Sequence, residues 1–172
     1  MTTQDLNSSE FNEYYNRYID KLSTNLSLIE GYKTGKNTVL NFFKSIPNDK
    51  LEYRYASGKW TVKEVLQHLI DTERIFMYRC FRIARRDTTS LVGYDQDIYI
   101  EPSKANNKSI EELLNEFEIN RNNSIAIINS LSDDDLKFVG VSSESPLSAR
   151  AAAFIILGHD IWHMEVIKER YL

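Results

Sequence analysis

Two short motifs, each followed by apolar residues at helical spacing, constrain the fold of this chain most strongly. Thr61-Val-Lys-Glu64 and Ser109-Ile-Glu-Glu112 both match the capping box. In that motif a hydroxyl side chain and a carboxylate three residues later satisfy free backbone donors at the start of a helix. Apolar residues then recur with helical periodicity to about Arg86 and to about Leu131. We therefore predict two long helices that begin at these motifs.

The apolar pattern predicts two further long helices. One runs from about Thr24 to Phe43, and the other runs from Ser145 to about Arg170, with Pro146 in its first turn, where a missing backbone donor costs nothing. A short helix is expected around Phe11 to Leu22. These segments predict an all-α fold with four main helices and little or no sheet.

The length of 172 residues fits one domain, and no repeat or linker divides the chain. We therefore expect residues 1–172 to form a single domain, with residues 1–10 as a flexible tail. The connection from Asp87 to Lys108 is long and rich in turn-forming residues, and loops of this length in compact domains often serve function. It contains the aromatic and acidic stretch Gly93-Tyr-Asp-Gln-Asp-Ile-Tyr99.

Composition excludes several classes of function. The net charge is −4 and no basic block is present, which argues against a nucleic-acid partner. The arginines at 79, 82, 85 and 86 are interpreted as a solvated helix face. The single cysteine, Cys80, is expected in the core and fits a reducing compartment. No signal peptide or membrane-spanning run is found, so we expect a cytoplasmic protein without membrane contact.

The chain contains only three histidines, and their spacing suggests a shared site. His159 and His163 are four residues apart, so on a helix both rings leave the same face and can reach one ion. His68 lies on the apolar stripe of its own helix and is therefore expected to point inward. Three buried imidazoles need polar partners. A divalent metal ion would satisfy all three rings at once, and the alternative is hydrogen bonding to backbone and water.

Three neutral imidazoles without a thiolate suit zinc, nickel, copper or iron(II), and the spacing does not choose among them. Three protein ligands leave room for water or substrate, which is typical of catalytic rather than structural zinc. The motif is not H-E-x-x-H, because Asp160 follows His159 and is rotated away from the ligand face. Glu64 is assigned to the capping box, and Asp71 to the surface or to a position beside a ligand.

These motifs resemble those of the DinB-like superfamily of metal-binding four-helix-bundle proteins. The stretch from Gly58 to His68 is similar to the W-[ST]-x-x-E-x-x-x-H motif of the second helix in that family, and the stretch from Gly158 to His163 matches the H-x-x-x-H of its fourth helix. Gly93-Tyr-Asp-Gln-Asp97 resembles a loop in one branch of the superfamily. The resemblance covers nearly the whole chain, with the order of the motifs kept.

The resemblance implies a bundle in up-down-down-up order, with a long crossover between the second and third helices and often a homodimer. It also implies a divalent ion, commonly nickel or zinc, held by His68, His159 and His163, with water at the open positions. Members with assigned activity include S-transferases that use bacillithiol or a related low-molecular-weight thiol, and maleylpyruvate isomerases that use mycothiol.

Two functional hypotheses follow. The first is a metal-dependent enzyme, S-transferase-like or hydrolase-like, which activates a thiol or water against a small-molecule substrate. Under this hypothesis Tyr94, Asp95 and Trp162 are candidates for the rim of the substrate pocket. The second hypothesis is a non-catalytic metal-binding bundle that acts in a stress response.

Overall fold

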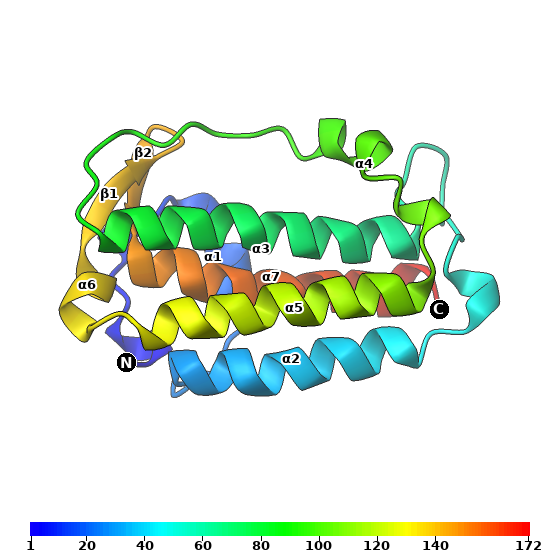
Figure 1. Cartoon of the computed structure of the whole chain (residues 1–172), viewed down its shortest axis with the longest axis horizontal. Helices are drawn as coiled ribbons and strands as arrows, with labels where there is room; N and C mark the ends of the chain where they lie inside the picture. The colour runs from blue at the N-terminus through cyan, green and yellow to red at the C-terminus, as the bar shows by residue number, and fades with distance from the viewer.

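The computed structural model describes residues 1–172 and contains four long helices. They are α2 (Leu28–Lys44), α3 (Val62–Ala84), α5 (Ile110–Asn129) and α7 (Ala149–Arg170). Figure 1 shows that α2 and α7 run in one direction along the bundle, and α3 and α5 in the other. The predicted four-helix bundle in up-down-down-up order is therefore confirmed.

Both capping boxes start helices as predicted. Thr61 and Glu64 satisfy each other's backbone groups at the start of α3, and Ser109 and Glu112 do the same at the start of α5. Each hydroxyl accepts a hydrogen bond from the amide three residues on, at 3.1 Å. The bond from Glu64 to Thr61 fixes the first turn of α3, the helix that carries His68.

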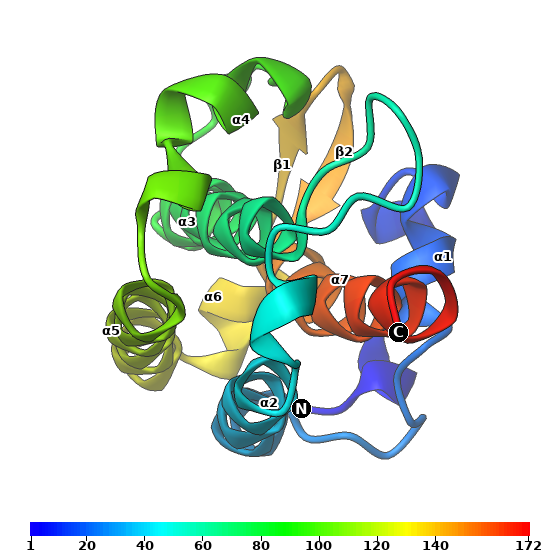
Figure 2. The same cartoon turned by 90° about the vertical axis from the view of Figure 1, so that its right-hand side faces the viewer.

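The first half of helix α7 is enclosed on all sides. Viewed along the bundle in Figure 2, the four helices occupy the corners of a quadrilateral, and α1 (Asn16–Ile19) lies against the outer side of α7. Every residue from Ala149 to Asp160 is buried. A helix that is apolar on all sides needs such cover, so α1 supplies a wall that the four-helix bundle alone would lack. No helix in the structure is both long and apolar enough to cross a membrane.

The N-terminal segment is structured along its length. Three short 3₁₀ turns, Thr3–Asp5, Ser8–Glu10 and Glu13–Tyr15, precede α1. The short helix expected around Phe11 to Leu22 is thus present in a briefer form. We expected residues 1–10 to be a flexible tail, but Glu10 is buried and accepts hydrogen bonds from Ser148 at 2.7 Å and from Nε of Arg150 at 2.8 Å. This buried ion pair connects the segment to the start of α7.

The connection between α3 and α5 is not the irregular loop that its composition predicted. It contains α4 (Asp97–Ser103) and a 3₁₀ turn (Ala105–Asn107), joined at Lys104, whose φ is 51°. Figure 1 shows this segment crossing back over α3 toward the end of the bundle where α3 begins. The crossover therefore lies over the helix that carries His68.

The expected start of the last helix was wrong. Residues Ser145–Ser148 form strand β2, which pairs antiparallel with β1 (Val139–Ser142), and α7 begins only after the N-cap Ser148. The turn between the strands places Ser143 and Glu144 at φ values of 52° and 62°. A two-residue turn with two positive φ angles suits a hairpin. Pro146 therefore lies in a strand rather than in the first turn of a helix.

Two other elements complete the chain, a 3₁₀ turn at Asn48–Lys50 and the short helix α6 (Asp133–Lys137). Cys80 is fully buried as predicted. The prediction of a solvated arginine face is wrong for Arg79. Only 3% of its surface is exposed, and its guanidinium donates to the Val92 carbonyl oxygen at 3.1 Å. It anchors the crossover to α3.

Candidate metal centre

The three histidines meet between α3 and α7. Nε2 of His159 lies 3.0 Å from Nε2 of His68 and 3.0 Å from Nε2 of His163. One ring nitrogen from each residue falls within 4.8 Å of the other two. All three residues are buried, with 3%, 5% and 8% of their surfaces exposed. The arrangement brings together every histidine of the chain.

Hydrogen bonds among the rings cannot account for this geometry. A ring nitrogen of a neutral imidazole offers either one proton or one lone pair. Nε2 of His159 contacts two other nitrogens at 3.0 Å, so it can form a hydrogen bond with only one of them. A divalent cation accepts all three lone pairs at once, and zinc bound to imidazole is well known in proteins. The donor set therefore fits a metal ion.

Burial also keeps the rings in the state that binds metal. Desolvation lowers the pKa of His68 to about 4. The pKa values of His159 and His163 are lowered well below their ordinary range by desolvation and by the neighbouring rings. Neutral rings keep a free lone pair at neutral pH, so no proton needs to be displaced before a cation binds.

Helix α1 closes one side of the site through a contact that only glycine allows. A Cβ atom at Gly158 would lie 2.0 Å from the carbonyl oxygen of Tyr18. Because of this close approach, the Tyr18 ring packs edge-on against His159 and Trp162, with centroid distances of 5.1 and 6.0 Å. Sequence reasoning did not place Tyr18 at the site. The glycine directly before His159 was the available signal.

Aromatic rings also enclose the other two ligands. The Trp60 ring, just before the N-cap of α3, lies with its centroid 4.8 Å from that of His68. The Trp162 ring lies edge-on to His163 with a centroid distance of 4.7 Å. These contacts shield the nitrogen cluster from water and leave two openings.

Two cavities reach the histidines from different sides. The first, of about 280 Å³, is bordered by His159, Tyr94 and Asp95. The second, of about 300 Å³, is bordered by His163 and Trp162. The residues that border both cavities are Tyr14, Tyr18, Gln96 and Asp97. Each cavity can admit a small molecule, and each of the predicted rim residues lines one of them.

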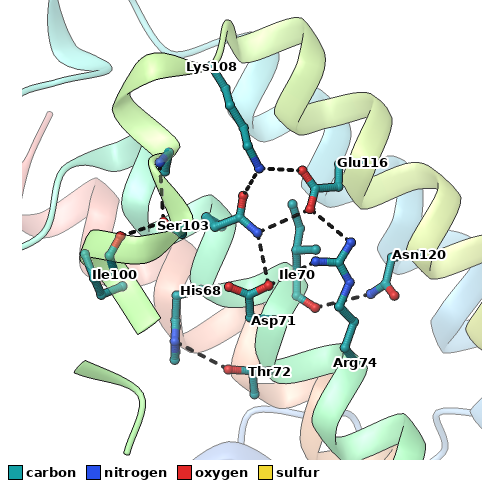
Figure 3. A network of polar contacts seen from close by, with 12 residues as sticks. His68, Ile70, Asp71, Thr72, Arg74, Ile100, Ser103, Lys108, Glu116 and Asn120 are labelled. Carbon is teal, nitrogen blue, oxygen red and sulfur yellow. Dashed lines mark hydrogen bonds and ion pairs between the residues drawn. The ribbon is translucent and has the colours of Figure 1, made fainter. Parts of the chain in front are cut away.

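A short polar chain runs from His68 toward the first cavity. Nδ1 of His68 lies 3.4 Å from Oγ1 of Thr72, and this hydroxyl lies 3.0 Å from the Tyr94 hydroxyl. Figure 3 shows the contact between His68 and Thr72. A partner on the second ring nitrogen is typical of metal-binding histidines, because it orients the ring.

The carboxylates near the histidines in sequence have other partners. Asp160 points away from the nitrogen cluster and accepts from Nη2 of Arg121 at 2.6 Å. Arg121 also contacts Glu73 at 2.7 and 3.0 Å, and all three side chains are buried. The sequence suggested few polar groups in this core, so this buried cluster was missed. Burial raises the pKa of Asp160 to about 6, although Arg121 opposes the shift.

The two remaining carboxylates on α3 do not join the site either. Glu64 caps the helix as expected. Asp71 accepts hydrogen bonds from Gln67 at 3.1 Å and Arg74 at 3.0 Å, in the network that reaches α5 in Figure 3. The cluster therefore contains three imidazoles and none of these carboxylates.

Two solved structures share this architecture. YfiT from Bacillus subtilis, "a probable metal-dependent hydrolase with an unusual four-helix bundle topology", superposes with a TM-score of 0.74 at 17% identity, over 96% of this chain and 90% of its own. A mycothiol-dependent maleylpyruvate isomerase superposes with a TM-score of 0.66 at 12% identity, over 81% of this chain and 60% of its own. No curated protein matches the chain in sequence.

A sequence model of a known family covers most of the bundle. The DinB superfamily model matches residues 32–167, which span the four long helices from the first turns of α2 to the last turns of α7. This range includes the three histidines and the crossover. The chain therefore belongs to the DinB superfamily.

Proposed function

We propose that this protein is a metal-dependent hydrolase of a small molecule, with nickel or zinc held by His68, His159 and His163. The observation that carries the proposal is the convergence of three buried, neutral Nε2 atoms beside two cavities. Structural zinc normally has four protein ligands, whereas catalytic zinc has three and leaves a position open. A three-histidine set therefore favours chemistry over a purely structural role.

The bound ion would supply Lewis acidity and a lowered pKa for water. The protein itself has three tasks. Burial of the imidazoles keeps their lone pairs free. The rings of Tyr18, Trp60 and Trp162 limit access of solvent to the histidines. The two cavities would position the substrate. For an acyl substrate such as an ester, net hydrolysis would break the bond between the acyl carbon and the leaving group and form a bond from that carbon to the water oxygen. A proton from the water would be transferred to the leaving group.

The relatives support two versions of this chemistry. YfiT, which this chain covers almost completely, is described as a probable metal-dependent hydrolase. The isomerase, which is covered over 60% of its length, depends on mycothiol. The more complete match favours water as the nucleophile. Transfer to a low-molecular-weight thiol is the second candidate, and the second relative is the observation that favours it.

The test begins with metal content and turnover. Purified protein should carry about one divalent ion per chain, and the loaded protein should hydrolyse 4-nitrophenyl acetate. His163→Ala should lose both the ion and the activity. Glu165→Gln is a matched control on the same helix, because this partly exposed residue pairs with Lys21 instead of facing the cluster. Equal rates with and without metal would contradict the proposal.

The same assay separates the alternatives. A rate that appears only when a low-molecular-weight thiol is added would assign the protein to thiol transfer. Stabilisation by metal without turnover of any ester or electrophile would instead favour the non-catalytic bundle.

A further inference from the structure

The hydroxyl groups of Thr72 and Tyr94 connect a metal-binding histidine to a cavity wall. Thr72 lies one helical turn after His68, and Tyr94 belongs to the crossover, so the contact joins α3 to a segment that is distant along the chain. Both hydroxyl-bearing residues and His159 border the cavity of about 280 Å³. A molecule that binds against this wall of the cavity can therefore reach the Tyr94 hydroxyl at the end of this polar chain.

The role of His68 fixes the direction in which the chain donates protons. Its Nε2 faces the other histidines and needs a free lone pair, so the neutral ring carries its proton on Nδ1. Nδ1 then donates to the Thr72 oxygen, and the Thr72 hydroxyl donates to Tyr94. Tyr94 forms no other hydrogen bond, so its own proton remains available for a molecule in the cavity.

Neighbouring side chains hold Tyr94 in the position from which it can donate a hydrogen bond into the cavity. Its ring lies with its centroid 5.6 Å from that of Tyr99, and the Arg79 guanidinium lies 5.6 Å from the same ring. Burial raises the pKa of Tyr94, so the hydroxyl stays protonated at neutral pH. The group is therefore a fixed hydrogen-bond donor.

The charge of the cavity selects the acceptor. Asp95 and Asp97 border the cavity, neither forms an ion pair, and no lysine or arginine borders it. Two carboxylates repel an anionic group at this position. A neutral oxygen, such as the carbonyl of an ester or amide, fits the donor without this repulsion.

We propose that the Tyr94 hydroxyl, oriented by Thr72, donates a hydrogen bond to the carbonyl oxygen of a neutral ester or amide substrate. The proposal rests on the proposed hydrolase function and names its substrate class. Negative charge develops on a carbonyl oxygen when its carbon is attacked, so a fixed donor there stabilises the transition state more than the ground state. Tyr94 would then act directly on the substrate, and Thr72 would be a positioning residue.

Binding of a neutral amide tests the donor. Equilibrium dialysis of acetanilide against the zinc-loaded protein should show affinity about five- to tenfold weaker in Tyr94→Phe, as expected for loss of one hydrogen bond. Tyr99→Phe is the matched control, because it removes a hydroxyl from the neighbouring ring outside this cavity. Equal affinity of Tyr94→Phe and wild type, no binding of acetanilide to wild type, or tighter binding of the benzoate anion would each overturn the proposal.

Zinc affinity tests the orienting role of Thr72. Thr72→Val removes the hydroxyl at nearly constant volume and should weaken zinc binding about 10- to 100-fold, as is usual when a partner of a ligand histidine is lost. Thr72→Ser keeps the hydroxyl and should restore most of the affinity. A merely structural effect of the valine would also lower the melting temperature of the metal-free protein. Equal zinc affinity in Thr72→Val and wild type would overturn this role.

The two proposals fail in different ways. If acetanilide binding depends on Tyr94 but metal-dependent cleavage is absent, the hydrolase is wrong and the contact stands. If ester cleavage depends on metal and Tyr94→Phe leaves both kcat and amide affinity unchanged, the hydrolase stands and the role of Tyr94 is wrong. Loss of one oxyanion donor should lower kcat by about 10²- to 10³-fold, in addition to the loss of ground-state affinity.

Discussion

His68 shows how burial sets the chemistry of a single residue in this protein. Desolvation alone lowers its pKa from 6.5 to about 4. At a pH between these two pKa values, the His68 ring carries a proton in the unfolded chain but not in the folded chain. Protonation therefore favours the unfolded state in this range, and the stability that comes from the neutral ring is present above pH 6.5 and lost as the pH falls toward 4.

This linkage gives a prediction for the metal-free protein. Its free energy of unfolding should fall between about pH 6.5 and 4, and His68 should contribute about 3 kcal/mol to the fall. His68→Gln cannot take up a proton at this position and should show a shallower pH dependence. Urea unfolding at a series of pH values measures both slopes.

The difference between the two proteins reports the protonation of His68 together with its effect on His159 and His163, whose pKa values it lowers. Asp160 acts in the opposite sense, because burial raises its pKa to about 6 and the folded state then binds more protons than the unfolded state. It is present in both proteins, so its effect cancels in the difference. Parallel pH profiles for wild type and His68→Gln would rule out the assigned role of the ring.

At the scale of elements, one guanidinium connects three of the four long helices. Arg121 of α5 lies between Glu73 of α3 and Asp160 of α7, with none of its side-chain surface exposed. The ring centroids of Tyr32 and Phe117 lie 5.0 and 4.9 Å from the Arg121 guanidinium carbon. Helix α7 carries two of the histidines, so this cluster also sets the position of the site.

Removal of this guanidinium should strongly destabilise the bundle. Arg121→Met would leave two carboxylates buried without a cation, and breaking a buried ion pair from one side costs about 3–5 kcal/mol. Lys21→Met, which breaks the exposed pair with Glu165, should cost at most about 1 kcal/mol. Chemical denaturation of the three proteins gives both differences. Similar losses of unfolding free energy in the two variants would show that the buried cluster stabilises the protein no more than the exposed ion pair does.

The elements that the sequence predicted well are those specified by local chemistry. The capping boxes at Thr61 and Ser109 mark the starts of α3 and α5 because their hydrogen bonds form within four residues. The hairpin of β1 and β2 was missed because its turn, at Ser143 and Glu144, lacks the glycine or asparagine that usually marks positive φ. Pro146 then suggested a helix start in its place.

The candidate site was predictable only in part for a similar reason. The i,i+4 spacing of His159 and His163 and the apolar stripe around His68 are periodic features, and the structure brings these residues together. Tyr18 and Thr72 depend on contacts between separate elements, which periodicity does not reveal. Asp160 follows closely after an apolar run in the sequence, and a carboxylate in that setting was the signal for a buried cation partner, which is Arg121 in the structure.

At the scale of the whole molecule, the metal centre depends on the complete fold. His68 and His159 are 91 positions apart in sequence, and their nitrogens meet only when α3 and α7 lie side by side. The unfolded chain therefore has no equivalent site. A ligand that binds only the folded state stabilises it by mass action.

Zinc should therefore raise the melting temperature of this protein. At a free concentration of about 100 times Kd the stabilisation is about 2.7 kcal/mol, which corresponds to an increase of about 5–10 °C for a domain of this size. His163→Ala should lose most of this increase, because two ligands bind more weakly than three. Glu165→Gln should keep the full increase, since the Glu165 side chain pairs with Lys21 instead of facing the cluster. Scanning calorimetry with zinc or with a chelator measures the shift, and an increase that survives in His163→Ala would place the bound ion elsewhere in the molecule.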